Sequence, residues 1–299
     1  MSSSQQQQQQ QSQGPGVVNV LHRTTYRYNF PVTFQTHRMV LRPREGHDLQ
    51  IQSHELTVSP NATLAWTKDV FGNSVTHAFF GDEQANELVI ESKLRMTRPP
   101  IKALDPSYPH EDSTFPGIVY DPLEQAALTC YLIPTYPEEA QLLNPWLNKL
   151  PQALDFTDSY AFILELTQHI NREITYRRRE EKGTQTPATT VSLGSGSCRD
   201  MATLMMETLR HQGIASRFVS GYLDCDATRA AQGSTHAWLE AYLPFRGWLG
   251  FDPTAGRACD HRHFVIATSH HPRGVMPISG KFFGAGNAYV GQTVQVEFS

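Results

Sequence analysis

The stretch 194–223, GSGSCRDMATLMMETLRHQGIASRFVSGYL, decides the fold class of this chain. Its Gly/Ser loop leads into a run of helical apolar periodicity that begins at Cys198 and ends before Gly213, a residue typical of the position just after a helix. The remainder, ASRFVSGYL, has the composition of a strand. The stretch therefore predicts a helix that starts at a cysteine and is followed by a strand.

Two blocks farther along, THAWLEAYL (235–243) and GWLGFD (247–252), alternate as neighbouring strands do. In the first block the packing face holds Ala237, Leu239, Ala241 and Leu243, and the opposite face holds His236, Trp238, Glu240 and Tyr242. A hairpin loop of three or five residues through LPFRG permits residue 242 to pair with 248, and hence 238 with 252. We therefore predict that Asp252 is the diagonal neighbour of His236, within reach of a side-chain hydrogen bond.

Cys198, His236 and Asp252 have the chemistry of a thiol nucleophile, its base and an orienting carboxylate. A helix start favours the thiolate, and its unpaired N–H groups can donate to an oxyanion. Each residue alone has a plainer explanation, because free cysteines pack well in cores and aspartate before proline is common in turns. The position of Cys198 at the helix start, outside the apolar stripe, favours the catalytic interpretation.

Other side chains near these blocks are weaker candidates. Trp238 and Trp248 could wall a substrate groove, although filling of an aromatic core explains them equally well. Arg199 and Asp200 could shape the site, but the helix dipole favours an acid in the first turn in any case. The histidines of DHRHF and SHHP lack zinc-ligand spacing and are interpreted as surface residues, so no metal site is predicted.

The composition is that of an ordinary globular protein and argues against several functional classes. Of the 299 residues, 39% are hydrophobic and 18% are charged, and the net charge of −4 provides no basic field for nucleic acid or an anionic membrane. The chain has no membrane-spanning run of about 18 apolar residues, and its first residues lack the pattern of a secretory signal. The four cysteines form no CxxC pair, which favours reduced thiols in the cytoplasm. Neither nucleic acid nor a membrane is an expected partner, and the oligomeric state stays open.

Changes of pattern divide the chain into four parts. They are a disordered polar tail (1–16), a β-sandwich of about seven antiparallel strands (17–98), a proline-rich linker (99–121), and a domain of helices followed by short strands (122–299). Helices of the last part are expected to begin after Asp121 and after Asp158, each of which precedes helical apolar periodicity as an N-cap does. The predicted fold class is α+β.

These blocks resemble the bacterial transglutaminase-like family, a branch of the papain-like cysteine superfamily. The matching pieces are LGSGSCRDMATLMMETLRHQGIASRFVSGYL, THAWLEAYLPFRGWLGFDPT and YRYNFPVTFQTHRMVLRP, the last of which resembles the β-rich domain that often precedes this core. The resemblance implies a cysteine-bearing helix packed on an antiparallel sheet, with Cys198 as nucleophile, His236 as general base and acid, and Asp252 as orienting group. It implies no organic cofactor and no calcium dependence. The segment HRHFVIATSHHPRGVMP departs from GRDYADVPP, which many relatives carry.

The expected function is that of a cysteine-dependent acyl-transfer enzyme with a peptide or protein substrate. Cys198 would form a thioester from a peptide or isopeptide amide and pass the acyl group to water, as a cysteine peptidase or amidase does. One alternative is a true transglutaminase that passes it to an amine, and another is a non-catalytic peptide-binding module that retains the fold. Acyl transfer from a thioester cofactor, as in arylamine N-acetyltransferases, is less favoured because those enzymes carry a helical bundle in place of the β-rich domain.

Overall fold

Two units make up the computed structural model of the chain, which describes residues 16–99, 115, 117–148, 158–230 and 232–299. The described parts of Met1–Ala103, Asp224–Ser234 and Ile278–Ser299 form the first unit, and those of Leu104–Leu223 and Thr235–Pro277 form the second. Most of the expected tail (1–16) and linker (99–121) lies outside the described residues. Those two expectations therefore stay predictions.

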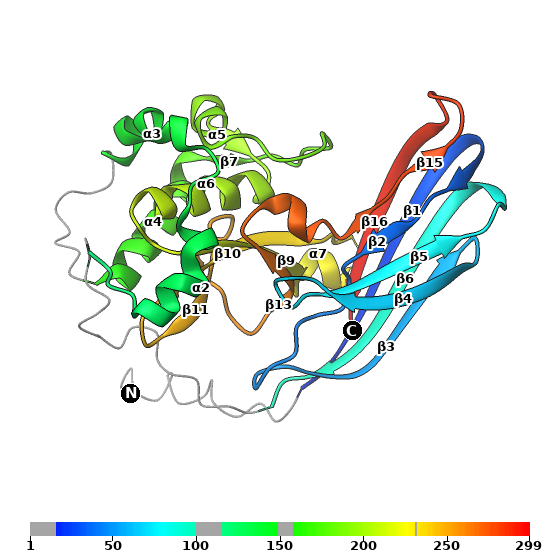
Figure 1. Cartoon of the computed structure of the whole chain (residues 1–299), viewed down its shortest axis with the longest axis horizontal. Coiled ribbons are helices and arrows are strands. Elements are labelled where there is room, and N and C mark those ends of the chain that lie inside the picture. The colour runs from blue at the N-terminus through cyan, green and yellow to red at the C-terminus, as the bar shows by residue number, and fades with distance from the viewer. Residues whose placement is uncertain (1–15, 100–114, 116, 149–157, 231) are drawn as a thin grey trace. The chain divides into compact units, whose positions relative to one another are not determined.

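Strands dominate the first unit. Its elements are β1 (Val17–Phe34), β2 (His37–Met39), β3 (Gln50–Ser59), β4 (Ala62–Lys68), β5 (Ser74–Phe80), β6 (Gln84–Thr97), the short helix α7 (Asp226–Arg229), β14 (Ile278–Ser279), β15 (Phe282–Phe283) and β16 (Tyr289–Phe298). One antiparallel sheet has the order β15-β1-β6-β3, with β16 also paired to β1, and a second has the order β14-β2-β5-β4 (Figure 1).

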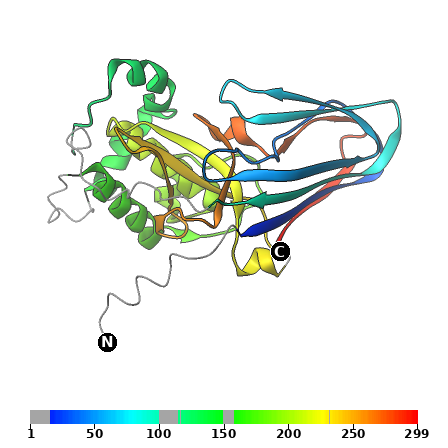
Figure 2. The ribbon, with the colours of Figure 1, turned by 90° about the horizontal axis from the view of Figure 1, so that it is seen from below.

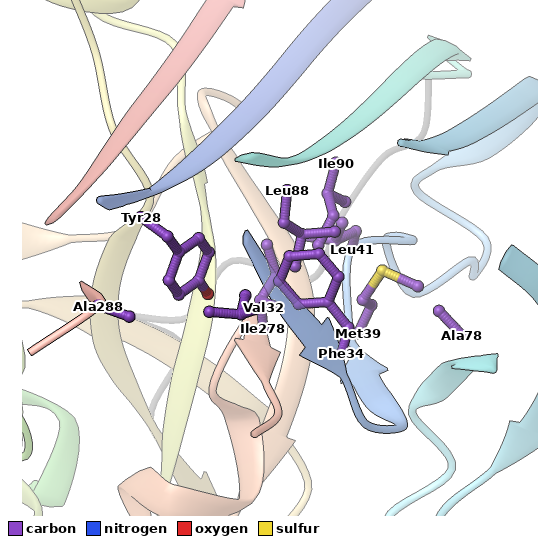
Figure 3. Packing of buried hydrophobic residues seen from close by; sticks show 10 residues of the cluster. All are labelled: Tyr28, Val32, Phe34, Met39, Leu41, Ala78, Leu88, Ile90, Ile278 and Ala288. Atoms are coloured by element: carbon purple, nitrogen blue, oxygen red, sulfur yellow. The ribbon is translucent and has the colours of Figure 1, made fainter. Parts of the chain in front are cut away.

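The two sheets share one hydrophobic core. Tyr28, Leu88 and Ile90 reach it from the first sheet, and Met39 and Ala78 reach it from the second. Figure 3 shows these side chains gathered together, and each is less than a tenth exposed. Because apolar side chains of both sheets meet in one cluster, the sheets pack face to face, as the period-two alternation predicts.

The C-terminal strands differ from their expected place. The alternation of TVQVEF identifies a strand, and the expected boundary assigns it to the domain of residues 122–299. In the structure β16 pairs with β1 in the first unit, with Val20 opposite Phe298 and Tyr26 opposite Gln292. Alternation marks which face of a strand is buried, but it carries no information on which strand becomes the partner.

The second unit combines helices with an antiparallel sheet. Its elements are α2 (Pro122–Leu132), η3 (Pro137–Glu139), α3 (Ala140–Leu147), α4 (Ser159–Glu173), β7 (Thr175–Tyr176), α5 (Pro187–Leu193), β8 (Ser195–Gly196), α6 (Cys198–His211), β9 (Ser216–Leu223), β10 (His236–Leu243), β11 (Gly247–Asp252), β12 (Arg257–Ala258), β13 (His263–Ser269) and η4 (Pro272–Val275). The sheet has the order β12-β11-β10-β9-β13, and α6 packs against β9 and β10 (Figures 1 and 2). Among the described helices, none has both the length and the apolar character needed to cross a bilayer.

The helix boundaries follow the predicted caps. Asp121 accepts a hydrogen bond from the N–H of Leu123 at 2.8 Å, and Asp158 accepts one from the N–H of Tyr160 at 2.9 Å. Gly213 takes the left-handed conformation after α6, with φ of 74°. Every residue of α6 from Asp200 to Arg210 is buried, so this helix lies inside the unit and fixes the direction in which its first residue points.

Candidate active site

The loop before α6 fixes the position of its N-terminus. Gly194 ends α5 in the left-handed conformation, and β8 then pairs in parallel with β7. Gly196 leaves no room for a side chain, because a Cβ there would lie 2.8 Å from the Cβ of Asp200. The chain turns directly from β8 into the helix, and Cys198 becomes its first residue with a partly exposed side chain.

Asp200 ties this N-terminus to the neighbouring loop. One carboxylate oxygen accepts the N–H and the hydroxyl of Ser197, at 2.8 and 2.7 Å, and the other accepts the N–H of Gln185 at 2.8 Å. Arg179 donates to both oxygens, at 2.8 and 2.9 Å. Burial alone would raise the pKa of this carboxyl group, but these hydrogen bonds lower the pKa below its ordinary value. Asp200 therefore shapes the site by holding the segment that carries Cys198.

The N-terminus of α6 also presents hydrogen-bond donors beside the sulfur. The N–H groups of Asp200 and Met201 bond to the carbonyl of Ser197, each at 3.0 Å. The N–H groups of Cys198 and Arg199 come earlier in the first turn, where a helix supplies no acceptor. A negative oxygen on a carbonyl attached to the Cys198 sulfur would meet these donors and the positive end of the helix dipole.

His236 and Asp252 meet as the hairpin register predicts. Tyr242 pairs with Trp248 between β10 and β11, so residue 252 follows in the position diagonal to residue 236. The Nε2 atom of His236 lies 2.8 Å from Oδ2 of Asp252. The predicted hydrogen bond between these two residues is confirmed.

The carboxylate of Asp252 is fully buried and hydrogen-bonded through both oxygens. Oδ1 accepts the N–H groups of Thr254 at 2.9 Å and Ala255 at 3.3 Å, in the turn that follows β11. Oδ2 lies against His236 and, at 3.3 Å, against Nε2 of His263. Burial raises the pKa of this carboxyl group, but its hydrogen bonds to His236 and His263 bring the pKa well below its ordinary value.

Asp252 and Cys198 both act on the ring of His236. Burial lowers the pKa of His236, but hydrogen bonds to Asp252 and Cys198 and the negative charges of both groups raise the pKa to about 10. Because Nε2 faces Asp252, Nδ1 is the ring nitrogen left for the sulfur of Cys198. The side chain of His236 is 13% exposed, so the ring is sheltered without being sealed from solvent. This arrangement can place a sulfur nucleophile beside a ring nitrogen that takes its proton.

The two tryptophans lie in different surroundings, and the substrate-binding role of Trp248 stays a prediction. Trp238 is only 1% exposed, and its ring lies 6.0 Å from the His236 ring, centroid to centroid. Trp248 packs against Tyr131, Tyr242 and the guanidinium of Arg217, which lies 3.9 Å above the indole. The substrate-binding expectation is wrong for Trp238, because its side chain is buried beside His236. Trp248 belongs to the aromatic cluster that packs against α2.

His263 is the residue that the sequence interpretation misses. It belongs to DHRHF, which is interpreted there as surface, yet its side chain is only 2% exposed and contacts Asp252. His236, Asp252 and His263 also place three possible metal-ligand atoms within 4.8 Å of one another. The hydrogen bonds already join these atoms in pairs, so the arrangement is accounted for without a metal ion. No spacing rule signals His263, because its partner lies on a different strand.

Known proteins share both regions of the chain. Residues 18–97 match the family model of the bacterial transglutaminase-like N-terminal region, and residues 150–253 match that of the transglutaminase-like superfamily. Both matched regions are transglutaminase-like. The second range contains Cys198, His236 and Asp252, and the superfamily it identifies is one of cysteine-dependent enzymes. The family resemblance and the α+β fold class inferred from the sequence are both confirmed.

Individual relatives agree with this family. The uncharacterized protein Rv2569c of Mycobacterium tuberculosis is 29% identical over 292 residues, covering 87% of this chain and 86% of the relative. A protein-glutamine gamma-glutamyltransferase of Pseudomonas aeruginosa is 39% identical over 66 residues, which are 20% of this chain and 10% of that protein. The crystal structure of a candidate cysteine protease from Cytophaga hutchinsonii has a TM-score of 0.73 at 18% identity, covers 96% of this chain and 91% of its own, and shows that the fold is shared.

Proposed function

We propose that this chain is a cysteine-dependent acyl-transfer enzyme that hydrolyses a peptide or isopeptide amide through a thioester at Cys198. The observation that carries the proposal is the hydrogen bond from His236 to the buried carboxylate of Asp252, together with the partly exposed Cys198 at the start of α6. Cys198 serves as nucleophile, His236 as general base and acid, and Asp252 as the group that orients the ring.

Acylation follows from this geometry. The Cys198 thiolate attacks the amide carbonyl carbon, and the carbonyl oxygen becomes an oxyanion beside the N–H groups at the start of α6. Collapse of this intermediate breaks the carbon–nitrogen bond. The imidazolium of His236 gives its proton to the leaving nitrogen, which departs as an amine, and the acyl group remains on the sulfur as a thioester. Asp252 stabilises the imidazolium and fixes its ring orientation throughout.

Deacylation uses the same base. Neutral His236 takes a proton from the acceptor as the acceptor attacks the thioester carbon, and Cys198 leaves as a thiolate that again pairs with the imidazolium. Water is the favoured acceptor. The carboxylates of Asp200 and Asp252 are both buried and already hydrogen-bonded within the protein. Neither therefore offers a free negative charge to an incoming ammonium group. The short similarity to the protein-glutamine gamma-glutamyltransferase favours an amine as the second candidate acceptor.

One experiment separates these outcomes. Wild-type protein and Cys198→Ala are incubated with a peptide mixture, with and without a primary amine, and mass spectrometry is used to find an enzyme-bound thioester and cleaved, deamidated or amine-linked products. We expect cleavage or deamidation by the wild type only. Substitution of the exposed Cys130 serves as the control and should leave turnover intact. Turnover by Cys198→Ala would remove the enzymatic proposal, whereas products linked to the amine would replace water by an amine as acceptor.

We also propose that the protein acts on peptides or proteins in the cytoplasm, without nucleic acid, membrane or cofactor. Cys130, Cys198, Cys225 and Cys259 are all free thiols, which suits a reducing compartment. Fractionation of cells that express the tagged protein checks this location. Recovery in a periplasmic or secreted fraction would contradict it.

A further inference from the structure

The second histidine of the site, His263, reaches Asp252 from the far edge of the sheet. It begins β13, which pairs with β9, and β9 and β10 separate that edge from β11, where Asp252 lies. Its Nε2 atom is 3.3 Å from Oδ2 of Asp252. The His263 ring also packs edge-on against the Trp238 ring, with 5.2 Å between the centroids. This contact restricts the orientation of the imidazole.

The hydrogen bonds of His263 identify it as a donor to Asp252. The backbone N–H of Asp260 lies 3.2 Å from Nδ1 of His263, and a backbone N–H can only donate. Nδ1 therefore accepts that bond in the neutral ring, which leaves the ring proton on Nε2, facing Asp252. Oδ1 of Asp260 also lies 3.3 Å from Nδ1, and the same oxygen accepts the backbone N–H of Arg262 at 3.0 Å.

With this donor, the carboxylate of Asp252 is saturated. A carboxylate has about four lone-pair sites. The N–H groups of Thr254 and Ala255 occupy the two sites of Oδ1, and His236 and His263 occupy the two sites of Oδ2. The turn amides hold Oδ1, and His263 adds to His236 a further point of attachment at Oδ2.

We propose that His263 is a positioning residue that fixes Oδ2 of Asp252 in the rotation at which it meets His236. This inference rests on the proposed roles of Cys198, His236 and Asp252. His263 contacts Asp252 through its Nε2 atom. It acts through Asp252, so its loss should lower the rate of the chemical step and leave substrate binding unchanged.

The test compares His263→Gln with His263→Met. The two side chains are similar in length, but only glutamine places an N–H donor near the position of Nε2. We measure the iodoacetamide alkylation rate of Cys198 at pH 7 by mass spectrometry, with the exposed Cys130 of the same molecule as internal control. Thermal melting of each variant reports folding. Where turnover is found, kcat and KM are measured as well.

We expect His263→Met to lower Cys198 alkylation and kcat about ten- to a hundred-fold, the effect of one charge-assisted hydrogen bond. KM and the Cys130 rate should not change, and His263→Gln should restore most of the loss. Wild-type reactivity in folded His263→Met would overturn the inference, as would an equal loss in His263→Gln. If His263→Met does not fold, His263→Asn, whose amide is too short to reach, takes its place. Wild-type Cys198 that reacts no faster than Cys130 would instead reject the proposed function.

Discussion

Replacing Asp200 by asparagine tests whether the buried carboxylate holds the start of α6. The substitution keeps the size of the side chain and removes its charge. Both oxygens accept a backbone N–H, one from Gln185 and one from Ser197, each at 2.8 Å. An asparagine amide has one oxygen and one NH2 group, so in either orientation it turns a donor toward a backbone N–H.

The cost of this change has two parts. An unsatisfied buried N–H costs about 1–3 kcal/mol. Breaking a buried ion pair by removing one partner costs about 3–5 kcal/mol. The side chain of Arg179 is 18% exposed and also lies 3.5 Å from Glu181. Losing its ion pair with Asp200 should therefore cost no more than the lower limit of that range. We therefore expect Asp200→Asn to lower the free energy of unfolding by about 3–5 kcal/mol in total.

Urea unfolding at pH 7 measures this loss through tryptophan fluorescence, because Trp146, Trp238 and Trp248 lie in the same unit as Asp200. Asp121→Asn is the matched control, since it makes the same chemical change at an exposed N-cap where asparagine caps equally well. The control should change stability by less than about 0.5 kcal/mol. A loss below about 1 kcal/mol for Asp200→Asn would refute the reasoning, because that is the value of one ordinary hydrogen bond.

Three further predictions follow from the same contacts. Asp252→Ala should lower kcat about ten- to ten-thousand-fold with the fold retained, because Asp252 orients the His236 ring and forms or breaks no bond itself. Steady-state kinetics measure kcat, and circular dichroism reports the fold. Full activity of the variant would contradict this prediction. His236 has a pKa of about 10 in the folded protein, above its ordinary value of 6.5, so its protonation stabilises the folded state fully below pH 6.5 and less as the pH rises to 10. The stability difference between wild type and His236→Gln should therefore shrink over that window in urea titrations, and a constant difference would argue against the ion pair. Gly221→Ala should lower the free energy of unfolding by about 1–3 kcal/mol. The added Cβ would lie 2.2 Å from the Trp238 ring and 2.4 Å from the carbonyl oxygen of Phe264. An unchanged melting temperature would contradict this prediction.

Local signals were sufficient for the helix caps and for the hairpin that carries the site. The loop between β10 and β11 is short, so only a few registers are possible, and side-chain parity selects among them. Tyr242 opposite Trp248 and the bond from His236 to Asp252 follow from those two constraints. The cysteine position is equally local, because the Gly/Ser loop, Asp200 and the helix period all lie within a few residues of it.

Burial of Trp238 was not predictable in the same way. Parity correctly places its side chain on the same face as His236, but parity says nothing about what covers that face. In the structure Gly221 on β9 and Gly250 on β11 flank the indole, and a Cβ on Gly221 would lie 2.2 Å from the ring. The two glycines leave the space in which the indole lies, so a residue that looks available for substrate is enclosed by the neighbouring strands.

Long-range pairing explains why β16 and His263 escaped sequence reasoning. Contacts between distant segments leave no periodic signal in the sequence. The pairing of β16 with β1 joins residues nearly 280 positions apart, such as Val20 and Phe298, whose strands look like any others. His263 shows the same limit inside the site. Its own segment gives a strand, but the contact with Asp252 depends on the order of β11, β10, β9 and β13 in the sheet.

The segment that contains β13 and the residues just after it is tied to the site at two points. His263 bonds to Asp252 at its beginning, and the carbonyl of His270, just past the end of β13, accepts a hydrogen bond from Arg210 of α6 at 2.7 Å. The helix that carries Cys198 and the hairpin that carries His236 and Asp252 are therefore both linked to one edge strand. A change of sequence in β13 can reach the carboxylate without altering a residue next to the sulfur, because His263 and Asp252 are both buried and a lost hydrogen bond between them is not replaced by solvent.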